Sequence, residues 1–337
     1  MKSKINMQAI ADHHNVSVVT VSKALNDKDG VSDELREKIK ETAEKLGYRP
    51  NHAARSLKTQ RNYNIGIMIA NRFVHTQETY YFNVASEIIK KLSELGYSGL
   101  MEILMPEDED AGHLPRMFLE QKVDGMIILG QMKNTYLTQL ETIDIPLIYL
   151  DFYVDHSNVD SIFSDNFFSS YRITSKLLDQ GHRSIGYIGN IFSTTSIQDR
   201  YLGYYKALLE HRIQPDPGMI INDRDDQGEL IDLEIPDVMP TAFVANCDQI
   251  AHRFIRVLKE HGYSVPDDVS VVSFDNSIFS TISSPQITTV DNNVKEMVDT
   301  ASRIIIKKID NPQRTYGRVL IKGTIIERES ARPINHK

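Results

Sequence analysis

Several apolar, strand-like runs of the sequence are followed directly by polar or aromatic residues that could bind a small ligand. Carboxylates and amides could hydrogen-bond such a ligand, and aromatic rings could cover its apolar faces. In open α/β sheets, ligands bind at the carboxyl ends of the strands. The residues that follow the runs are Asn71, Phe73, Gln131, Asp151, Phe152, Asn190, Phe192, Asn246, Cys247, Asp248 and Asp275. We expect a binding site built from these strand ends.

Patterns that mark common catalytic and metal sites do not occur. The sequence contains neither G-x-G-x-x-G nor G-x-x-x-x-G-K-[ST], the glycine-rich loops that bind nucleotide phosphates. His13 and His14 are neighbours and would point in different directions on a helix, so we expect them to be solvated. We expect the acidic run 107–110 to be a solvated loop before a helix rather than a cation site. The sequence therefore predicts no enzyme, no cofactor and no metal.

From residue 64 onward, apolar strand-like runs alternate with amphipathic helices along the sequence. These are the elements that must position the strand-end residues. This alternation is typical of a mostly parallel sheet covered by helices on both faces. The expected strands include residues 65–69, 125–129, 146–150, 185–188, 242–245 and 269–274. One domain of about 150 residues needs fewer elements, so we expect two similar lobes with a ligand-binding cleft between them.

Charge is distributed unevenly along the 337 residues, whose formal net charge is −8. Residues 1–61 carry 12 basic and 8 acidic residues, or +4, which leaves −12 for the remainder. A basic segment on an acidic body is typical of a nucleic-acid module, but on charge alone chance clustering is an equal alternative. The single cysteine, and the lack of a signal-like segment or a run of about 20 apolar residues, predict a cytoplasmic protein.

The first sixty residues have the pattern of a helix-turn-helix motif. A helix is expected over 7–13, and Ser17 is placed to cap a second helix over 18–25. In the second helix Val21 and Leu25 would face the core, which leaves Val18, Val19, Ser22 and Lys23 to face away. Ser32 is expected to cap a third helix that ends at Gly47. The apolar stripe of this helix is Leu35, Ile39, Ala43 and Leu46.

A fourth, short helix is expected over residues 52–58, with Asn51 as its cap. It is too short to be stable alone in water, so it must fold against another surface. Leu57 lies beside Lys58 in a basic setting and could be a wedge between DNA base steps. The alternative is a linker helix whose leucine packs on the next domain.

Four runs of this segment, residues 5–12, 15–26, 31–39 and 46–57, follow one another in a specific order. Together they resemble the LacI/GalR family of bacterial transcription regulators. The resemblance implies that the second helix reads the major groove of operator DNA. It implies base contacts from Val18, Val19 and Lys23, phosphate contacts from Ser17, Thr20 and Asn26, and a minor-groove hinge helix with Asn51, Ala54 and Leu57. The family usually has arginine where Lys23 stands, and lysine lacks the planar fork of arginine, so base discrimination is expected to be weaker.

The rest of the chain resembles the family's ligand-binding body more loosely, through residues 164–166, 180–189, 199–204 and 273–276. The resemblance implies a fold like that of periplasmic sugar-binding proteins, with two doubly wound α/β lobes and three crossovers. Residues 62–162 with about 291–323 would form the lobe nearer the DNA, and 163–290 with 324–332 the distal lobe. Arg200, expected to open a helix, and Asp275 match the family's effector-binding arginine and aspartate. Both could make paired hydrogen bonds to sugar hydroxyls.

Cys247 stands where many relatives have an asparagine that contacts the effector. A thiol is a poor substitute for an amide, so either Asn246 makes the contact or the effector differs. Cys247 could equally be a small buried residue at a helix start.

The resemblance implies a head (1–50), a hinge helix and linker (51–61) and a body for effector binding and dimerisation (62–337). The expected function is allosteric transcription control, usually repression, by a homodimer on a near-palindromic operator. A sugar or sugar derivative is the preferred effector. A purine-like ligand or a protein corepressor is the alternative. The sequence allows the effector to act either as an inducer, which weakens operator binding, or as a corepressor, which strengthens it. A sugar-transport binding protein would share the body but would need a signal peptide and no DNA-binding head.

Overall fold

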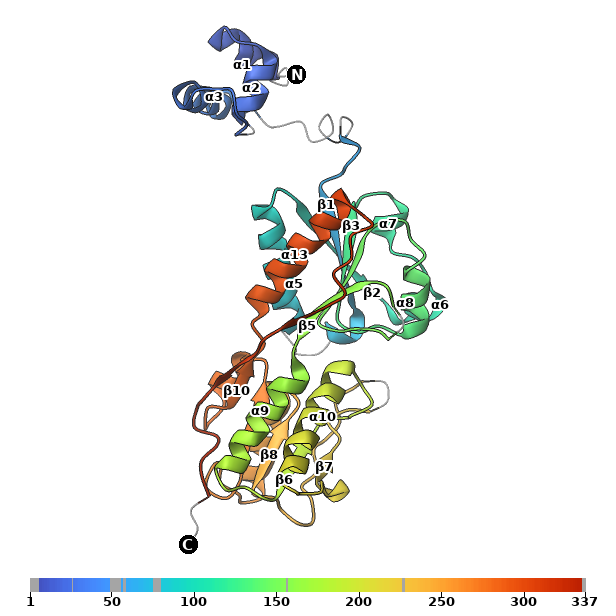
Figure 1. Cartoon of the computed structure of the whole chain (residues 1–337), viewed down its shortest axis with the longest axis vertical. Helices are drawn as coiled ribbons and strands as arrows, with labels where there is room; N and C mark the ends of the chain where they lie inside the picture. The colour runs from blue at the N-terminus through green and yellow to red at the C-terminus, as the bar shows by residue number, and fades with distance from the viewer. Residues whose placement is uncertain are drawn as a thin grey trace. The chain divides into compact units, whose positions relative to one another are not determined.

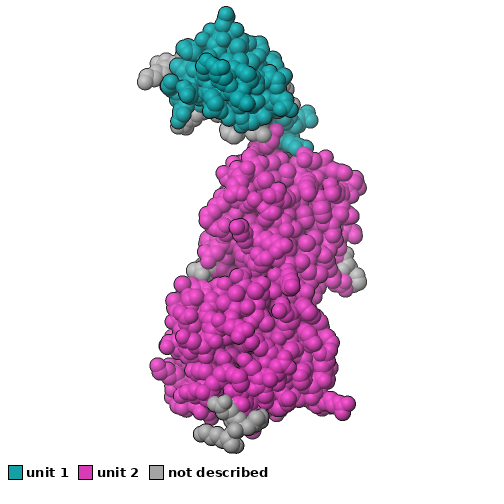
Figure 2. All heavy atoms as spheres, turned by 60° about the vertical axis from the view of Figure 1, so that its left-hand side comes forward, with its two compact units in different colours: residues 1–61 teal, residues 62–337 magenta. Residues whose placement is uncertain are grey.

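The computed structural model describes residues 6–25, 27–48, 56, 59–74, 80–155, 157–225 and 228–334. The chain forms two compact units, residues 1–61 and 62–337 (Figures 1 and 2). Within the described residues, no helix is long and apolar enough to cross a membrane.

The described residues of the first unit include the helices α1 (Met7–His14), α2 (Val18–Leu25) and α3 (Asp33–Lys45). The turn between α1 and α2 depends on Asn15, whose φ of 54° is left-handed, a conformation that asparagine tolerates better than most residues. Ser17 accepts a hydrogen bond from the Thr20 amide, and Ser32 accepts one from the Leu35 amide, so both predicted caps are confirmed. The buried residues of this small core are Ile10, Ala11, Val21, Ala24, Ile39 and Ala43.

One expected core position in this unit is wrong, and one core residue was missed. Leu46 is 38% exposed because it is the C-cap of α3, where the helix has already ended. Leu25 is partly buried and packs against this core as expected, and Ala24, which was not predicted, is fully buried beside it. A small residue at that position lets α2 approach α1 and α3 closely, and a periodicity count that scores only large apolar residues misses it.

The second unit is built on two six-stranded sheets. The first has the order β11 (Arg318–Ile321), β5 (Asp160–Ser164), β4 (Leu147–Leu150), β3 (Gly125–Leu129), β1 (Asn64–Ala70) and β2 (Ser98–Leu104), and it is parallel throughout. The second has the order β12 (Thr324–Ile326), β10 (Thr288–Asp291), β9 (Ser270–Phe274), β8 (Ala242–Ala245), β6 (Ile185–Ile188) and β7 (Ile220–Ile221). All six predicted strands are present. The β10–β12 pair is antiparallel, so the second sheet is mixed at one edge rather than wholly parallel.

Helices cover both faces of each sheet (Figure 1). On the first sheet, α5 (Tyr80–Glu94) and α13 (Val294–Asp310) pack together on one face, and α7 (Arg116–Leu119) and α8 (Asn134–Leu140) lie on the other, with α6 (Pro106–Ala111) nearby. On the second sheet, α9 (Asn166–Asp179) packs against α10 (Thr195–Glu210), and α11 (Asp248–Glu260) with α12 (Ile278–Ile282) covers the opposite face. Two short 3-10 turns, η1 (Asn71–Phe73) and η2 (Pro217–Met219), follow β1 and precede β7.

The chain passes between these two lobes three times. It leaves the first sheet after β5, returns after β10, and leaves again between β11 and β12. We call the part built on the first sheet the first lobe and the part built on the second sheet the second lobe. Each sheet is covered on both faces, which explains why the central strands are continuous apolar runs rather than alternating ones.

Candidate functional site

A small pocket of about 90 Å³ lies where the carboxyl ends of strands from both lobes meet, and we call it the inner pocket. The first lobe supplies Phe73, Tyr80, Tyr81 and Asp151. The second lobe supplies Thr194, Ser196, Ile197, Arg200, Arg224, Asn246, Cys247, Gln249, Asp275, Ser277 and Phe279. Six of the nine residues predicted for effector binding are therefore brought together here.

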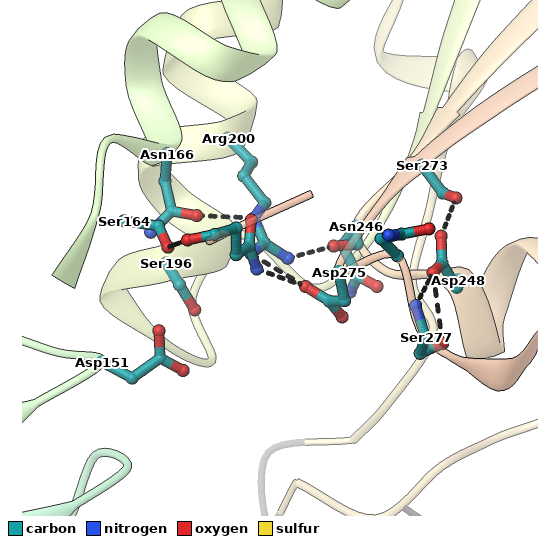
Figure 3. Close-up of polar contacts among 12 residues, drawn as sticks. Asp151, Ser164, Asn166, Ser196, Arg200, Asn246, Asp248, Ser273, Asp275 and Ser277 are labelled. Carbon is teal, nitrogen blue, oxygen red and sulfur yellow. Dashed lines mark hydrogen bonds and ion pairs between the residues drawn. The ribbon is translucent and has the colours of Figure 1, made fainter. Parts of the chain in front are cut away.

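Arg200 is the best-connected side chain of the pocket and is buried (Figure 3). Its Nε donates to Asn166 Oδ1 at 2.8 Å, and its Nη1 donates to the Asn246 carbonyl at 2.5 Å. Its Nη2 lies 3.2 Å from Asp275 Oδ1, and the guanidinium lies over the Phe274 ring. The expectation that Arg200 opens a helix is wrong, because α10 begins at Thr195 with Thr194 as its cap. Arg200 therefore comes from the interior of the helix, on the face that packs against the second sheet.

Asp151 approaches the pocket from the first lobe, just after β4 (Figure 3). Its Oδ2 accepts a hydrogen bond from the Tyr81 hydroxyl at 3.1 Å. Its Oδ1 is buried and has no hydrogen-bond partner among the described residues. Burial raises the pKa of the Asp151 carboxyl to about 7, although the positive charge of Arg200 opposes the rise. A buried acceptor without a donor is costly, and this oxygen has the capacity to accept one further hydrogen bond.

Asn246 and Cys247 occupy the end of β8 and the start of α11. Asn246 is buried, and its Nδ2 donates to Asp223 Oδ2 at 2.8 Å, while its Oδ1 has no partner in the described part of the chain. Cys247 is partly buried, stands at the N-cap of α11 and lines the pocket without capping the helix through its side chain. Its position thus agrees with both interpretations of Cys247, as a residue at a helix start and as part of the pocket wall.

Asp248 is buried next to the pocket but does not line it. Its carboxylate accepts hydrogen bonds from the Ser273 hydroxyl, the Thr289 hydroxyl and both the amide and hydroxyl of Ser277. Burial raises the pKa of Asp248 to about 7. Asp248 therefore joins α11, β9, β10 and the start of α12, and it holds Ser277 at the pocket wall. Its place beside the strand end was visible in the sequence, but its role as a structural acceptor was not.

The other predicted residues lie in a larger, adjoining groove of about 730 Å³, which we call the outer groove. Asn71, Gln131, Phe192 and Asn190 line it, and Phe73, Thr194 and Arg224 line both compartments. Phe152 lines neither. It is buried and stacks on Tyr149 in the core of the first lobe.

The acidic run 107–110 is not the solvated loop that we expected. It lies in α6, which begins at Pro106, and Glu109 is buried. Glu109 accepts hydrogen bonds from Arg72 Nη1 at 2.6 Å and from the Lys133 amide at 2.6 Å. Proline at the first helical position and acidic residues in the first turn both favour a helix here. The distant partner Arg72 accounts for the burial of the carboxylate.

Several pocket residues were missed, and Ser277 is one of them although it stands only three residues after the end of β9. Tyr81 lies in the first turn of α5, Ser196 in the first turn of α10, and Ser277 at the start of α12. A helix start beside a strand end is the only sequence signal that could have indicated them.

In the first unit, α2 presents the side chains that were predicted to contact DNA. Val19 is 65% exposed, and Thr20 and Lys23 are partly exposed. Val18 was expected to face away from the core, but it is partly buried and packs against it. Ser17 and Thr20 lie side by side, with their hydroxyl oxygens 2.9 Å apart. Asn26, Asn51, Ala54 and Leu57 lie outside the described residues.

Comparison with known proteins gives two matches along the chain. Residues 6–51 match the bacterial regulatory proteins of the lacI family, and residues 174–331 match the periplasmic binding protein-like domain. The chain belongs to the LacI family. Its membership confirms the predicted fold class of a helix-turn-helix head followed by a two-lobed α/β body, and it makes the protein a DNA-binding transcriptional regulator rather than an enzyme.

Relatives within the LacI family align over almost the whole chain. The ribose operon repressor of Haemophilus influenzae is 26% identical over 329 residues, covering 96% of this chain and 98% of that protein. The HTH-type transcriptional repressor PurR of Histophilus somni is 28% identical over 335 residues, with coverage of 96% and 98%. The Lac repressor dimer bound to operator and the anti-inducer ONPF is 22% identical, with a TM-score of 0.73 and coverage of 97% of this chain and 99% of that one. At this identity the likeness to Lac repressor shows the fold.

Proposed function

We propose that this LacI-family protein is a transcriptional repressor whose operator affinity is controlled by a small carbohydrate bound between the two lobes. The observation that carries the proposal is the inner pocket, where the ion pair of buried Arg200 and partly buried Asp275 faces Asp151 from the other lobe. A ligand that joins these groups contacts both lobes at once, and it can therefore favour one arrangement of the lobes.

The hydrogen-bonding character of the inner pocket supports a polyhydroxylated ligand. Three buried acceptor atoms, Asp151 Oδ1, Asn246 Oδ1 and Gln249 Oε1, have no partner among the described residues. Each hydroxyl of a sugar can donate one hydrogen bond and still accept another. The rings of Phe73 and Phe279 line the same pocket and can cover the apolar face of a sugar.

The operator contacts in this proposal are those implied by the family pattern. Val18, Val19 and Lys23 contact base edges, and Ser17, Thr20 and Asn26 contact phosphates. Asn51, Ala54 and Leu57 belong to a hinge segment that enters the minor groove. One head covers one half-site, so a homodimer binds a near-palindromic operator. The dimeric state of the related Lac repressor supports this assembly.

Control follows from linkage between the two sites. If the effector is an inducer, it weakens operator binding, and operator DNA weakens effector binding by the same factor. If the effector is a corepressor, each strengthens the binding of the other. Measuring operator affinity with and without the effector distinguishes an inducer from a corepressor.

The first test is thermal unfolding of the full chain against mono- and oligosaccharides, sugar acids, sugar phosphates and purines. A ligand at about 100 times its Kd adds about 2.7 kcal/mol to the stability of the state that binds it. The chain has no tryptophan, so an extrinsic dye or calorimetry reports the transition. We expect stabilisation by one class of sugar, lost in Asp151→Ala, and a change in operator affinity with the same sugar. Stabilisation by purines alone would overturn the carbohydrate proposal.

A further inference from the structure

The inner pocket and the outer groove are two compartments of one cleft, joined along Phe73, Thr194 and Arg224. We infer that the effector is an uncharged oligosaccharide of at least two sugar units. Its terminal unit enters the inner pocket, and the next unit lies in the outer groove against Phe192. This inference rests on the proposed carbohydrate-controlled function and specifies the class of ligand.

Volume is the first argument. The inner pocket holds about 90 Å³, well below the roughly 300–1,000 Å³ typical of ligand sites. The outer groove holds about 730 Å³ and falls within that range. Polar side chains line both compartments, but the buried acceptors that have no partner among the described residues, Asp151 Oδ1, Asn246 Oδ1 and Gln249 Oε1, belong to residues of the smaller one, and most of the space lies in the larger one. A ligand that uses both must extend from one into the other.

Phe192 is the second argument. Its side chain is 85% exposed although it lines a groove. The Phe192 amide donates to Asn190 Oδ1 at 3.0 Å. Asn190 is itself buried, with its amide donating to Asp223 Oδ1 at 2.8 Å. The backbone under the ring is therefore fixed, and the aromatic face is available to stack on the carbon–hydrogen face of a sugar ring.

Charge is the third argument. Three cations line the outer groove, Arg72, Lys133 and Arg224, and each has a carboxylate partner among the described residues. Arg72 pairs with Glu109 at 2.6 Å, Arg224 with Asp223 at 2.8 Å, and Lys133 with Asp110. A phosphate or a carboxylate on the ligand would have to compete with these carboxylates. The groove therefore favours a neutral ligand and disfavours sugar phosphates, sugar acids and nucleotides.

Gln131 links the two lobes beside this path. It lies just after β3 in the first lobe, and its Oε1 accepts a hydrogen bond from the Thr195 amide at the start of α10, at 2.8 Å. The same residue lines the outer groove. A second sugar unit in the groove would thus lie against a contact between the lobes, which couples ligand length to lobe arrangement.

The test is isothermal titration of the full chain with matched series of increasing length. Suitable series are glucose, cellobiose and cellotriose; glucose, maltose and maltotriose; xylose, xylobiose and xylotriose; and mannose with mannobiose. The proteins are the wild type, Phe192→Ala, and Phe168→Ala as the matched control. Phe168 is also an exposed phenylalanine, at 46%, but it lies on α9 and lines neither compartment.

In one series we expect the disaccharide to bind at least about tenfold more tightly than its own monosaccharide, equivalent to about 1.4 kcal/mol. Phe192→Ala should remove that increment and leave monosaccharide affinity within about twofold, whereas Phe168→Ala should change neither. A monosaccharide that binds as tightly as its oligomers, with no effect of Phe192→Ala, would overturn the inference and leave the carbohydrate function intact. Tighter binding of a sugar 6-phosphate than of the neutral sugar would overturn the charge argument. Binding of purines and of no saccharide would overturn both proposals.

Discussion

Arg200 and Asp275 form an ion pair that is withdrawn from solvent, with Nη2 and Oδ1 3.2 Å apart and side chains only 7% and 15% exposed. The two residues come from α10 and from the end of β9, 75 positions apart in the chain. Asn292 Nδ2 also donates to Asp275 Oδ1, at 2.8 Å, so the carboxylate is held where the chain crosses back to the first lobe. This pair is at once part of the inner pocket and part of the framework of the second lobe.

Replacing Arg200 should therefore cost stability as well as ligand binding. Arg200→Met leaves Asp275 buried without its cationic partner, and we expect a loss of about 3–5 kcal/mol in the free energy of unfolding, measured by urea denaturation. The control is Arg303→Met, which removes an exposed partner of Asp299 on α13. A surface pair contributes little, so the control should unfold almost like the wild type. Equal losses in the two variants would contradict the assigned role of the buried pair.

Asp151 should make stability depend on pH in a defined direction. Its pKa rises from 3.8 to about 7 on burial, so the folded protein binds more protons than the unfolded chain between these values. The stability that Asp151 contributes is present at low pH and is lost as pH rises through about 7. Asp151→Asn cannot titrate. As pH rises from about 5 to about 7, the free energy of unfolding of Asp151→Asn should therefore increase relative to that of the wild type, by up to about 1.4 kcal/mol per pH unit.

The measurement for Asp151 is urea denaturation of both proteins over this pH range. Asp248 titrates in both, so it cancels in the comparison. The matched control is Asp144→Asn, which removes an exposed carboxylate of the same lobe. A constant difference between wild type and Asp151→Asn across the range would show that Asp151 does not hold a proton in the folded state.

Lys23 should influence which operators bind. A lysine in the major groove can donate to guanine O6 and N7, and a good base contact discriminates by about 1–3 kcal/mol. We expect Lys23→Ala to relax base preference at one position of each half-site in a selection from random DNA. The control is Lys38→Ala, on the exposed surface of α3 and paired with Glu34. An unchanged sequence preference in Lys23→Ala would refute the contact.

Asp248 should be a stability residue rather than a ligand contact. Asp248→Ala leaves the hydroxyls of Ser273 and Thr289 and the Ser277 amide without their acceptor. Buried groups that lose a partner cost about 1–3 kcal/mol each when unsatisfied, so we expect a loss of about 3 kcal/mol or more in the free energy of unfolding. Asp248→Asn keeps one acceptor oxygen and should lose less. If Asp248→Ala unfolded like the wild type but lost ligand affinity, Asp248 would be a binding residue instead.

Local chemistry was sufficient to predict much of the fold from the sequence. The helices of the head begin and end where caps dictate, because Asn15 tolerates a left-handed turn and Ser17 and Ser32 accept amide hydrogen bonds within three residues. The central strands are apolar runs because both faces of each sheet are covered. These signals act within a few residues, so they can be read along the chain.

The positions of the strand ends in the sequence also predicted several residues of the inner pocket correctly. Asp151, Asn246 and Asp275 all line the inner pocket, because parallel strands bring their carboxyl ends to one edge of a sheet. The same rule failed for Phe152, the immediate neighbour of Asp151, which turns into the core and stacks on Tyr149. Successive residues after a strand point to opposite sides, and the sequence does not state which side faces the cleft.

Only the tertiary structure decided which distant residues become partners. The acidic run 107–110 looks solvated in the sequence, yet Glu109 is buried because Arg72 lies beside it. Asp248 reads as a helix start and is instead shared by three other elements. The division of the predicted binding residues between the inner pocket and the outer groove likewise depends on how the two lobes meet. Burial and pairing are properties of three-dimensional packing, and a linear sequence carries them only through the types of residue available to pair.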